Sequence, residues 1–203
     1  MDYRKVAVGD YVAKIASRTV SPGGGSAAAL AAALGAALNL MVINFGIPTS
    51  AEGEVPEELI KLKGRQEAFL EDALRLMNED CAVFKDLMDA ISARNATPRH
   101  YRAAALVPME ICRTACESMK IAWSTLSLVR GSITGDIECS RGMLLSAFSS
   151  ASLNVAMNLK GMASGEEANG MEKELQLLGD DIRRVSRDIE DELRLRGIVK
   201  GDR

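Results

Sequence analysis

The sequence contains few of the residues that build metal sites and stacking surfaces. It has one histidine, one tryptophan, three tyrosines and four phenylalanines among 203 residues. The cysteines form no CxxC pair, and His100 is far along the chain from all of them: Cys81, Cys112, Cys116 and Cys139. A metal site is therefore not expected. Free thiols, together with an N-terminal segment that lacks a secretion signal, predict a cytoplasmic protein.

Neither sign of charge is in clear excess. The 25 Lys and Arg residues and the 28 Asp and Glu residues give a formal net charge of −3, and aromatic residues make up 4% of the chain. Nucleic-acid binding needs a basic patch and often stacking aromatics, so we expect no nucleic-acid partner. With 47% apolar residues, the chain has the composition of an ordinary globular protein, and residues 1–203 are predicted to form a single domain.

A long apolar run extends from Ala27 to Phe45. It is nearly long enough to span a bilayer. About half of it is alanine and glycine, Asn39 and Asn44 interrupt it, and no basic residue closely flanks it as an anchor. We therefore expect no membrane span, and predict a helix at the centre of a bundle or at a contact between subunits.

The rest of the sequence also favours helices. Clusters of β-branched residues are few, and no Asn-Gly or Asp-Gly turn lies between alternating apolar runs. The predicted fold is all-α, a single-domain bundle of about six helices. The expected helices cover residues 2–17, 25–46, 55–93, 98–130, 138–163 and 166–196.

The third expected helix carries an apolar stripe with one acidic member. Its residues follow one another at intervals of three and four: Leu59, Leu62, Gln66, Phe69, Ala73, Leu76, Asp80, Phe84, Leu87 and Ile91. A carboxylate facing a core is costly unless it is paired, hydrogen-bonded or kept for function, and burial raises its pKa. Asp80 is thus a candidate catalytic residue. The alternatives are a carboxylate that binds a loop or backbone group, or one turned outward beside Glu79.

A glycine-rich segment precedes the apolar helix: Ser21, Pro22, Gly23, Gly24, Gly25 and Ser26. Successive glycines allow backbone angles that are closed to other residues, and the free N–H groups at the start of a helix can hold an anion. The GxGxxG pattern and the P-loop lysine are both missing, so a nucleotide site is not indicated. The segment is either a binding loop or a flexible connection in which Ser26 caps the helix.

Two amides lie one helical turn apart in the fifth expected helix. Asn154 and Asn158 share a face with Ala147 and Ala151. They bind either the edge of a heteroaromatic ring or a neighbouring helix. In the preceding helix, Pro108 removes one backbone hydrogen bond and is predicted to produce a kink.

Four segments, in order, carry a family resemblance. They are SRTVSPGGGSAAALAAALGAALNLMV at 17–42, EDCAVFKDLMDA at 79–90, VPMEI at 107–111 and NVAMNLKGM at 154–162. Together they resemble the cyclodeaminase/methenyltetrahydrofolate cyclohydrolase family, which includes the C-terminal half of the bifunctional formiminotransferase-cyclodeaminase. The resemblance implies an all-α fold, a homodimer with a folate pocket between its subunits, and chemistry on the one-carbon bridge of tetrahydrofolate. A tetrahydrofolate derivative is then the substrate, and no prosthetic group is expected.

The resemblance also assigns roles to residues already singled out. Asp80 matches the carboxylate proposed as catalytic in the family, residues 21–26 lie at the pocket, and Asn154 and Asn158 match the family's pair of asparagines. The expected activity is hydrolysis of 5,10-methenyltetrahydrofolate to 10-formyltetrahydrofolate. One alternative is formiminotetrahydrofolate cyclodeaminase, which releases ammonia. The other is a folate-binding homologue without catalysis, because Ser140 stands where the family has an acidic residue and segment 46–50 lacks the family's basic cluster.

The apolar helix also predicts an assembly. A helix of about twenty residues that is apolar on nearly every side is too apolar for one small bundle to cover, so part of it is expected to contact a second subunit. We therefore predict a two-fold homodimer with Ala32 and Gly35 at the contact, and with the loop 21–26 close to the partner.

Overall fold

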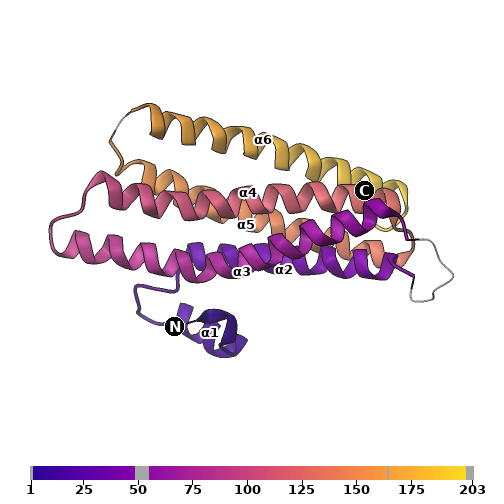
Figure 1. Ribbon diagram of the computed structural model, residues 1–203, viewed down its shortest axis with the longest axis horizontal. Coiled ribbons are helices and arrows are strands. Elements are labelled where there is room, and N and C mark those ends of the chain that lie inside the picture. Colours follow the sequence, from indigo (N-terminus) through magenta and orange to yellow (C-terminus); the bar gives the residue numbers. More distant parts are fainter. Residues whose placement is uncertain (1, 49–54, 164, 200–203) are drawn as a thin grey trace.

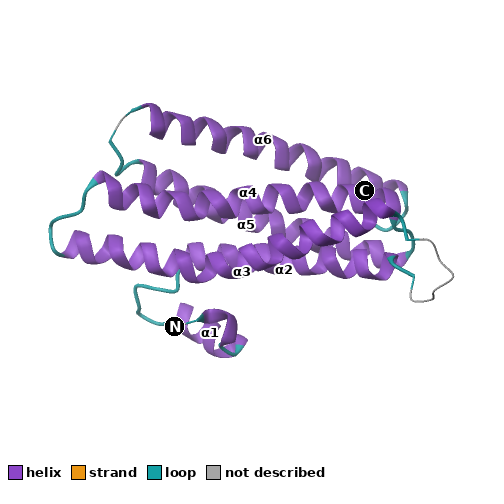
Figure 2. Ribbon diagram, in the orientation of Figure 1, coloured by secondary structure: helices purple, strands orange, loops and turns teal. Residues whose placement is uncertain are grey.

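The computed structural model describes residues 2–48, 55–163 and 165–199. Residues 49 and 50, part of the segment that lacks the basic cluster, lie outside this description. The described residues form six α-helices and no strand (Figures 1 and 2), as the sequence predicts. The helices are α1 (Val8–Ile15), α2 (Gly24–Gly46), α3 (Glu57–Ser92), α4 (Pro98–Leu128), α5 (Gly135–Leu159) and α6 (Glu166–Leu195).

The five long helices form the bundle, in which α2 contacts three of the others. Helices α2 to α6 run side by side along the long axis of the molecule, with the short α1 outside them (Figure 1). Helix α2 packs against α3, α4 and α5, and α6 covers α4 and α5. Two short 3₁₀ turns, Tyr3–Lys5 and Ser132–Thr134, precede α1 and α5.

The first helix differs from the expectation of one helix over 2–17. The side chain of Asp2 accepts a hydrogen bond from the Arg4 N–H, which closes the 3₁₀ turn instead of a longer helix. Ala7 is extended, with ψ at 140°, and α1 begins only after it. A side chain that bonds to the nearby backbone competes with helix formation in this way. The side chain of Asn78 on α3 also donates to Asp2, so the turn is fixed to the bundle.

The small residues of α2 bring it close to α5 of the same chain. A Cβ atom at Gly35 would lie 2.7 Å from Cγ of Leu144 and 3.2 Å from the Ser140 carbonyl oxygen. The Ser140 hydroxyl donates to the Gly35 carbonyl at 2.7 Å, and Ala32 is fully buried. The prediction that Ala32 and Gly35 contact a second subunit is therefore wrong, because both are buried within the bundle, Gly35 against α5.

The opposite face of α2 is open. Leu34 is 48% exposed and Phe45 70% exposed. A groove of about 490 Å³ runs beside Phe45, lined by Ala37, Leu40, Met41, Asn44, Phe45, Ile47 and Leu70. Helix α2 is long and apolar enough to cross a membrane, but 56% of its most apolar 18-residue window is buried inside the bundle. Burial of that extent is also found in the core helices of globular domains.

A buried polar cluster joins three helices at the centre of the bundle. Gln66, the amide in the apolar stripe of α3, donates to the Ser118 hydroxyl at 2.8 Å and to the Ala36 carbonyl at 3.0 Å. Asn39 donates to Gln66 at 3.1 Å. All three side chains are fully buried. Their hydrogen bonds fix the relative positions of α2, α3 and α4, since a buried polar group left without a partner is costly.

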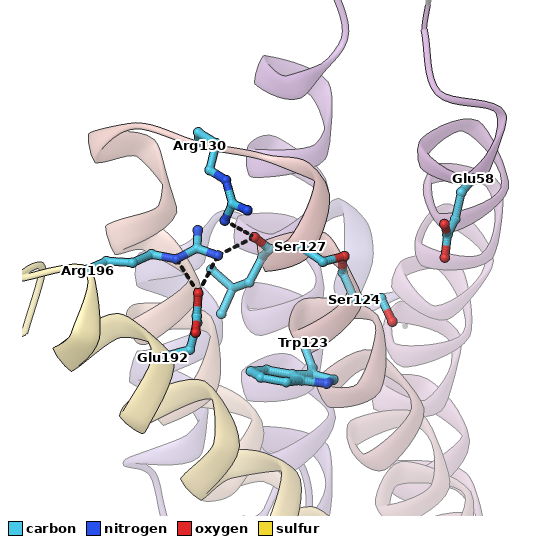
Figure 3. A pocket seen from close by; sticks show the side chains of 8 residues that line it. Glu58, Trp123, Ser124, Ser127, Arg130, Glu192 and Arg196 are labelled. Atoms are coloured by element: carbon cyan, nitrogen blue, oxygen red, sulfur yellow. Dashed lines mark hydrogen bonds and ion pairs between the residues drawn. The ribbon is translucent and has the colours of Figure 1, made fainter.

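Two arginines close the C-terminal end of α4 beside a cavity of about 360 Å³ (Figure 3). Arg196 donates to the carbonyl oxygens of Leu126 and Val129, and Arg130 donates to Leu126 at 3.1 Å. Arg196 also pairs with Glu192 at 2.7 Å. Carbonyl groups at the end of a helix lack partners within the helix, and positive charge there complements the helix dipole. Both guanidinium groups therefore cap the C-terminal end of α4.

Candidate functional site

The carboxyl group of Asp80 lies directly against the start of α2. A Cβ atom built on Gly25 would lie 1.9 Å from Oδ1 of Asp80 and 2.5 Å from its Cγ. The carboxyl group thus fills the space that any side chain at position 25 would need, so only glycine fits there. The structure brings together two candidates, the acidic member of the α3 stripe and the glycine-rich segment, that the sequence indicated separately.

The surroundings of Asp80 favour its neutral form. Burial raises its pKa from 3.8 to about 6, although a hydrogen bond from the Ser26 backbone N–H acts in the opposite direction. A carboxyl group with a pKa near neutrality is present in both protonation states at physiological pH, which suits a general acid or base. The interpretation of Asp80 as a side chain turned outward beside Glu79 is thereby excluded, whereas its contact with a backbone group is confirmed.

Helix α2 begins at Gly24, two residues before Ser26, the residue expected to cap it. Gly23 is the N-cap and makes no side-chain capping bond, and Gly24 and Gly25 form the first turn. The interpretation of Ser26 as the cap is therefore wrong. The N–H of Ser26 points to the Asp80 carboxyl group, so an internal acid lies where the N-terminus of a helix would otherwise bind an anion.

The Ser26 hydroxyl faces the interior and bonds to the N-terminal helix. It lies 2.8 Å from the Tyr11 hydroxyl, and both residues are buried. The Cys81 thiol lies in the same cluster. Burial raises the pKa of Cys81, while hydrogen bonds with Ser26 and Ser21 lower it. Sequence reasoning missed Tyr11, because nothing in the pattern of α1 distinguishes this tyrosine from an ordinary core residue.

Asn154 lies beside the glycine-rich segment. Its Nδ2 atom is 3.7 Å from the position of a Cβ atom on Gly24. The same nitrogen donates to the Ser150 carbonyl of its own helix at 2.8 Å. Asp80, the start of α2 and Asn154 therefore form one site, contributed by α3, α2 and α5.

Asn158 bonds to the neighbouring helix. Its Nδ2 donates to the carbonyl oxygen of Ala104 on α4 at 2.8 Å. One of the two alternatives for the asparagine pair, a bond to another helix, is thus confirmed for Asn158. A role in binding a ligand stays a prediction for both asparagines and for all six residues of the segment 21–26.

His100, Cys112 and Cys116 have structural roles. His100 bonds to the hydroxyl and the backbone N–H of Thr97 and so caps α4. Cys112 and Cys116 are buried, and burial raises the pKa of each thiol to about 12. In the described ranges, no three His, Cys, Asp or Glu residues come together as a metal-binding group.

Two curated relatives match this chain at low identity. Formimidoyltransferase-cyclodeaminase of Gallus gallus is 26% identical over 164 residues, which are 75% of this chain and 30% of that protein. The chain thus spans less than a third of the length of the Gallus gallus protein. Methenyltetrahydrofolate cyclohydrolase of Methylorubrum extorquens is 28% identical over 173 residues, which are 80% of this chain and 83% of that protein.

A solved structure and a family model agree with these matches. The crystal structure of formiminotetrahydrofolate cyclodeaminase from Thermotoga maritima superimposes with a TM-score of 0.86 at 20% identity, over 94% of this chain and 97% of that chain. At this identity the match shows a common fold. The formiminotransferase-cyclodeaminase model matches residues 7–177, most of the sequence. The chain therefore belongs to the formiminotransferase-cyclodeaminase family.

Proposed function

We propose that this protein is a folate one-carbon enzyme that hydrolyses 5,10-methenyltetrahydrofolate to 10-formyltetrahydrofolate. The observation that carries the proposal is the Asp80 carboxyl group, held against Gly25 with a pKa of about 6. The name of the Methylorubrum extorquens relative, which this chain matches over most of that protein's length, supports this reaction first.

Asp80 has the chemistry that the hydrolysis requires. The substrate carries a cationic carbon between N5 and N10, and a nearby carboxylate stabilises that charge. As water attacks this carbon, the carboxylate accepts one of its protons, and a C–O bond forms. The protonated Asp80 then donates to N5 as the C–N5 bond breaks. The second proton of the water leaves to solvent, which yields the 10-formyl product and restores the carboxylate.

The rest of the site suits the binding of a planar, polar ring system. The first turn of α2 begins with Gly24, which is exposed, so the backbone at this position is open to a ligand. Asn154, beside this turn, is a neutral amide with both donor and acceptor capacity. We assign substrate binding to the segment 21–26 and to the asparagines, and catalysis to Asp80.

Cyclodeamination is the second candidate, favoured by the name of the Thermotoga maritima protein with the same fold. In that reaction N10 attacks the formimino carbon, and ammonia leaves from the same carbon. A carboxyl group near this carbon donates the proton that the departing nitrogen needs. The position of Asp80 serves both reactions, since each passes through a tetrahedral carbon bonded to N5 and N10.

Substrate absorbance separates the candidates. Loss of the methenyl absorbance from 5,10-methenyltetrahydrofolate, above the rate without protein, indicates the cyclohydrolase. Gain of that absorbance from the formimino compound, with release of ammonia, indicates the cyclodeaminase. Lack of turnover with either substrate contradicts the enzyme proposal, and calorimetry with tetrahydrofolate then tests the third possibility, a binding protein without catalysis. Ser140 motivates that possibility, since its hydroxyl is buried on the Gly35 carbonyl.

We further propose that a second copy of the chain covers the open face of α2. The family resemblance implies a homodimer, and this face exposes Leu34 and Phe45 beside an apolar groove. Apolar surface of this kind is typical of contacts between subunits. The contact residues differ from those expected from the sequence, because Ala32 and Gly35 are buried within the bundle.

A further inference from the structure

The backbone of α4 lacks one hydrogen bond at a buried position. In an α-helix, the carbonyl of each residue accepts a bond from the N–H four residues later. Pro108 has no N–H, so the carbonyl of Ala104 loses its partner, while the helix continues to Leu128. Ala104 and Pro108 are both buried. A buried carbonyl without a partner is costly, so another donor has to serve it.

Asn158 on α5 supplies that donor. Its Nδ2 lies 2.8 Å from the Ala104 oxygen. Because the nitrogen is the donor and the oxygen is not, this bond sets the orientation of the amide: nitrogen towards α4, oxygen away from that carbonyl. Pro108 therefore decides, through a backbone atom, how a side chain on another helix is turned.

Asn154 is oriented in the same manner one turn earlier. Its Nδ2 donates to the Ser150 carbonyl at 2.8 Å. In the described part of the chain, neither asparagine Oδ1 accepts a hydrogen bond, and neither is sealed from solvent. Residues one turn apart are about 5–6 Å from each other on a helix surface. The pair thus offers two amide oxygens as acceptors on one face of α5.

We propose that Pro108 is a positioning residue, which acts through the Ala104 carbonyl on Asn158, and that the two amide oxygens recognise a ligand edge with two N–H donors. An aminopyrimidine edge has this chemistry. The ligand half of this proposal rests on the proposed folate function. The positioning half concerns the protein alone and is tested without substrate.

Hydrogen exchange of the Asn158 side-chain amide tests the positioning half. Pro108→Ala restores a helical N–H that competes for the Ala104 carbonyl, so we expect the Asn158 amide protons to exchange about fivefold faster or more in the variant, measured by NMR. Pro98→Ala is the matched control. Pro98 is the first residue of the same helix, where no N–H is needed, and this variant should leave the exchange rate unchanged. An unchanged rate in Pro108→Ala overturns the proposal.

Steady-state kinetics with 5,10-methenyltetrahydrofolate test the ligand half. We expect Pro108→Ala to raise KM about fivefold, the scale of one hydrogen bond, with kcat within about twofold of the wild type. Asn158→Ala should raise KM at least as much, and adding Pro108→Ala to it should have no further effect. A drop in kcat alone, or effects that multiply in the double variant, overturn the ligand half. Lack of turnover in the wild type refutes the proposed function instead, and leaves the exchange result to decide the positioning half.

Discussion

Replacing Gly25 with alanine tests whether the Asp80 carboxyl group must lie against the start of α2. The new Cβ atom would lie 1.9 Å from Oδ1, whereas ordinary contacts begin at 3.4 Å, so the carboxyl group has to move by about 1.5 Å. A displacement of about 1 Å in a reacting group lowers turnover by about 100-fold. We therefore expect kcat for methenyl hydrolysis to fall on this scale.

The same substitution has a calculable effect on stability. Overpacking costs about 1–3 kcal/mol, and alanine in a helix recovers up to about 1 kcal/mol relative to glycine. We expect the free energy of unfolding to decrease by about 1–2 kcal/mol in urea denaturation. In an Asp80→Ala background the obstructing carboxyl group is gone, so Gly25→Ala should no longer destabilise the protein.

A matched variant distinguishes this clash from a general effect of alanine. Gly64 lies within α3, and a Cβ atom there meets nothing within 4 Å. Gly64→Ala should keep full turnover and gain up to about 1 kcal/mol of stability. Wild-type turnover and stability in Gly25→Ala would refute the assigned position of Asp80.

Four further predictions concern the acid, the N-terminal helix and the assembly. Asp80→Asn should lower kcat by about 100-fold or more and remove the rise of kcat with pH through about 6, since only the carboxylate accepts a proton; near-normal turnover would remove Asp80 from the mechanism. Folding raises the pKa of Asp80 from 3.8 to about 6. The stabilisation that its protonated form gives the wild type is therefore complete below pH 3.8 and is lost as the pH rises through 6. Above pH 6, Asp80→Asn should be more stable than the wild type by up to about 3 kcal/mol in urea denaturation. Tyr11→Phe removes the hydroxyl bonded to Ser26 and should lower the free energy of unfolding by about 1 kcal/mol. The control is Tyr3→Phe, at a neighbouring ring 5.4 Å away, which should have no such effect. Equal losses of stability in both variants would contradict the role of this bond. Phe45→Glu places a charge on the open face of α2 and should dissociate the proposed homodimer in sedimentation experiments; a monomeric wild type at micromolar concentration would contradict the proposed assembly.

Local sequence pattern predicted the helices and the unusual position of Asp80. Helical periodicity depends on neighbours three and four residues apart, so the α3 stripe could be traced from Leu59 to Ile91. Leu59 and Leu87 are buried in the structure, whereas Ile91, at the end of the stripe, is 39% exposed. The boundaries were less predictable. The break before α1 depends on Asp2, whose side chain accepts a hydrogen bond from the backbone N–H of Arg4. This hydrogen bond competes with helix formation, and a pattern of apolar residues does not predict it.

The contacts that build the site join distant segments, and the sequence pattern does not encode them. Asp80 and Gly25 belong to different helices, and their contact depends on how α3 crosses the start of α2. The two interpretations of Asn158 stayed open for the same reason, since the choice depends on a carbonyl of α4. The long apolar run predicted a contact between subunits at Ala32 and Gly35, but Ala32 is fully buried and Gly35 packs against α5.

The arginines at the end of α4 bear on the order in which the protein folds during synthesis. Arg196 follows Leu126 by 70 residues, yet it donates to the Leu126 carbonyl. A chain leaves the ribosome from its N-terminus, so α4 emerges with its last carbonyl groups exposed to water and acquires this partner only after α6 has been made. The last turn of α4 is therefore completed only after the chain has been made as far as Arg196.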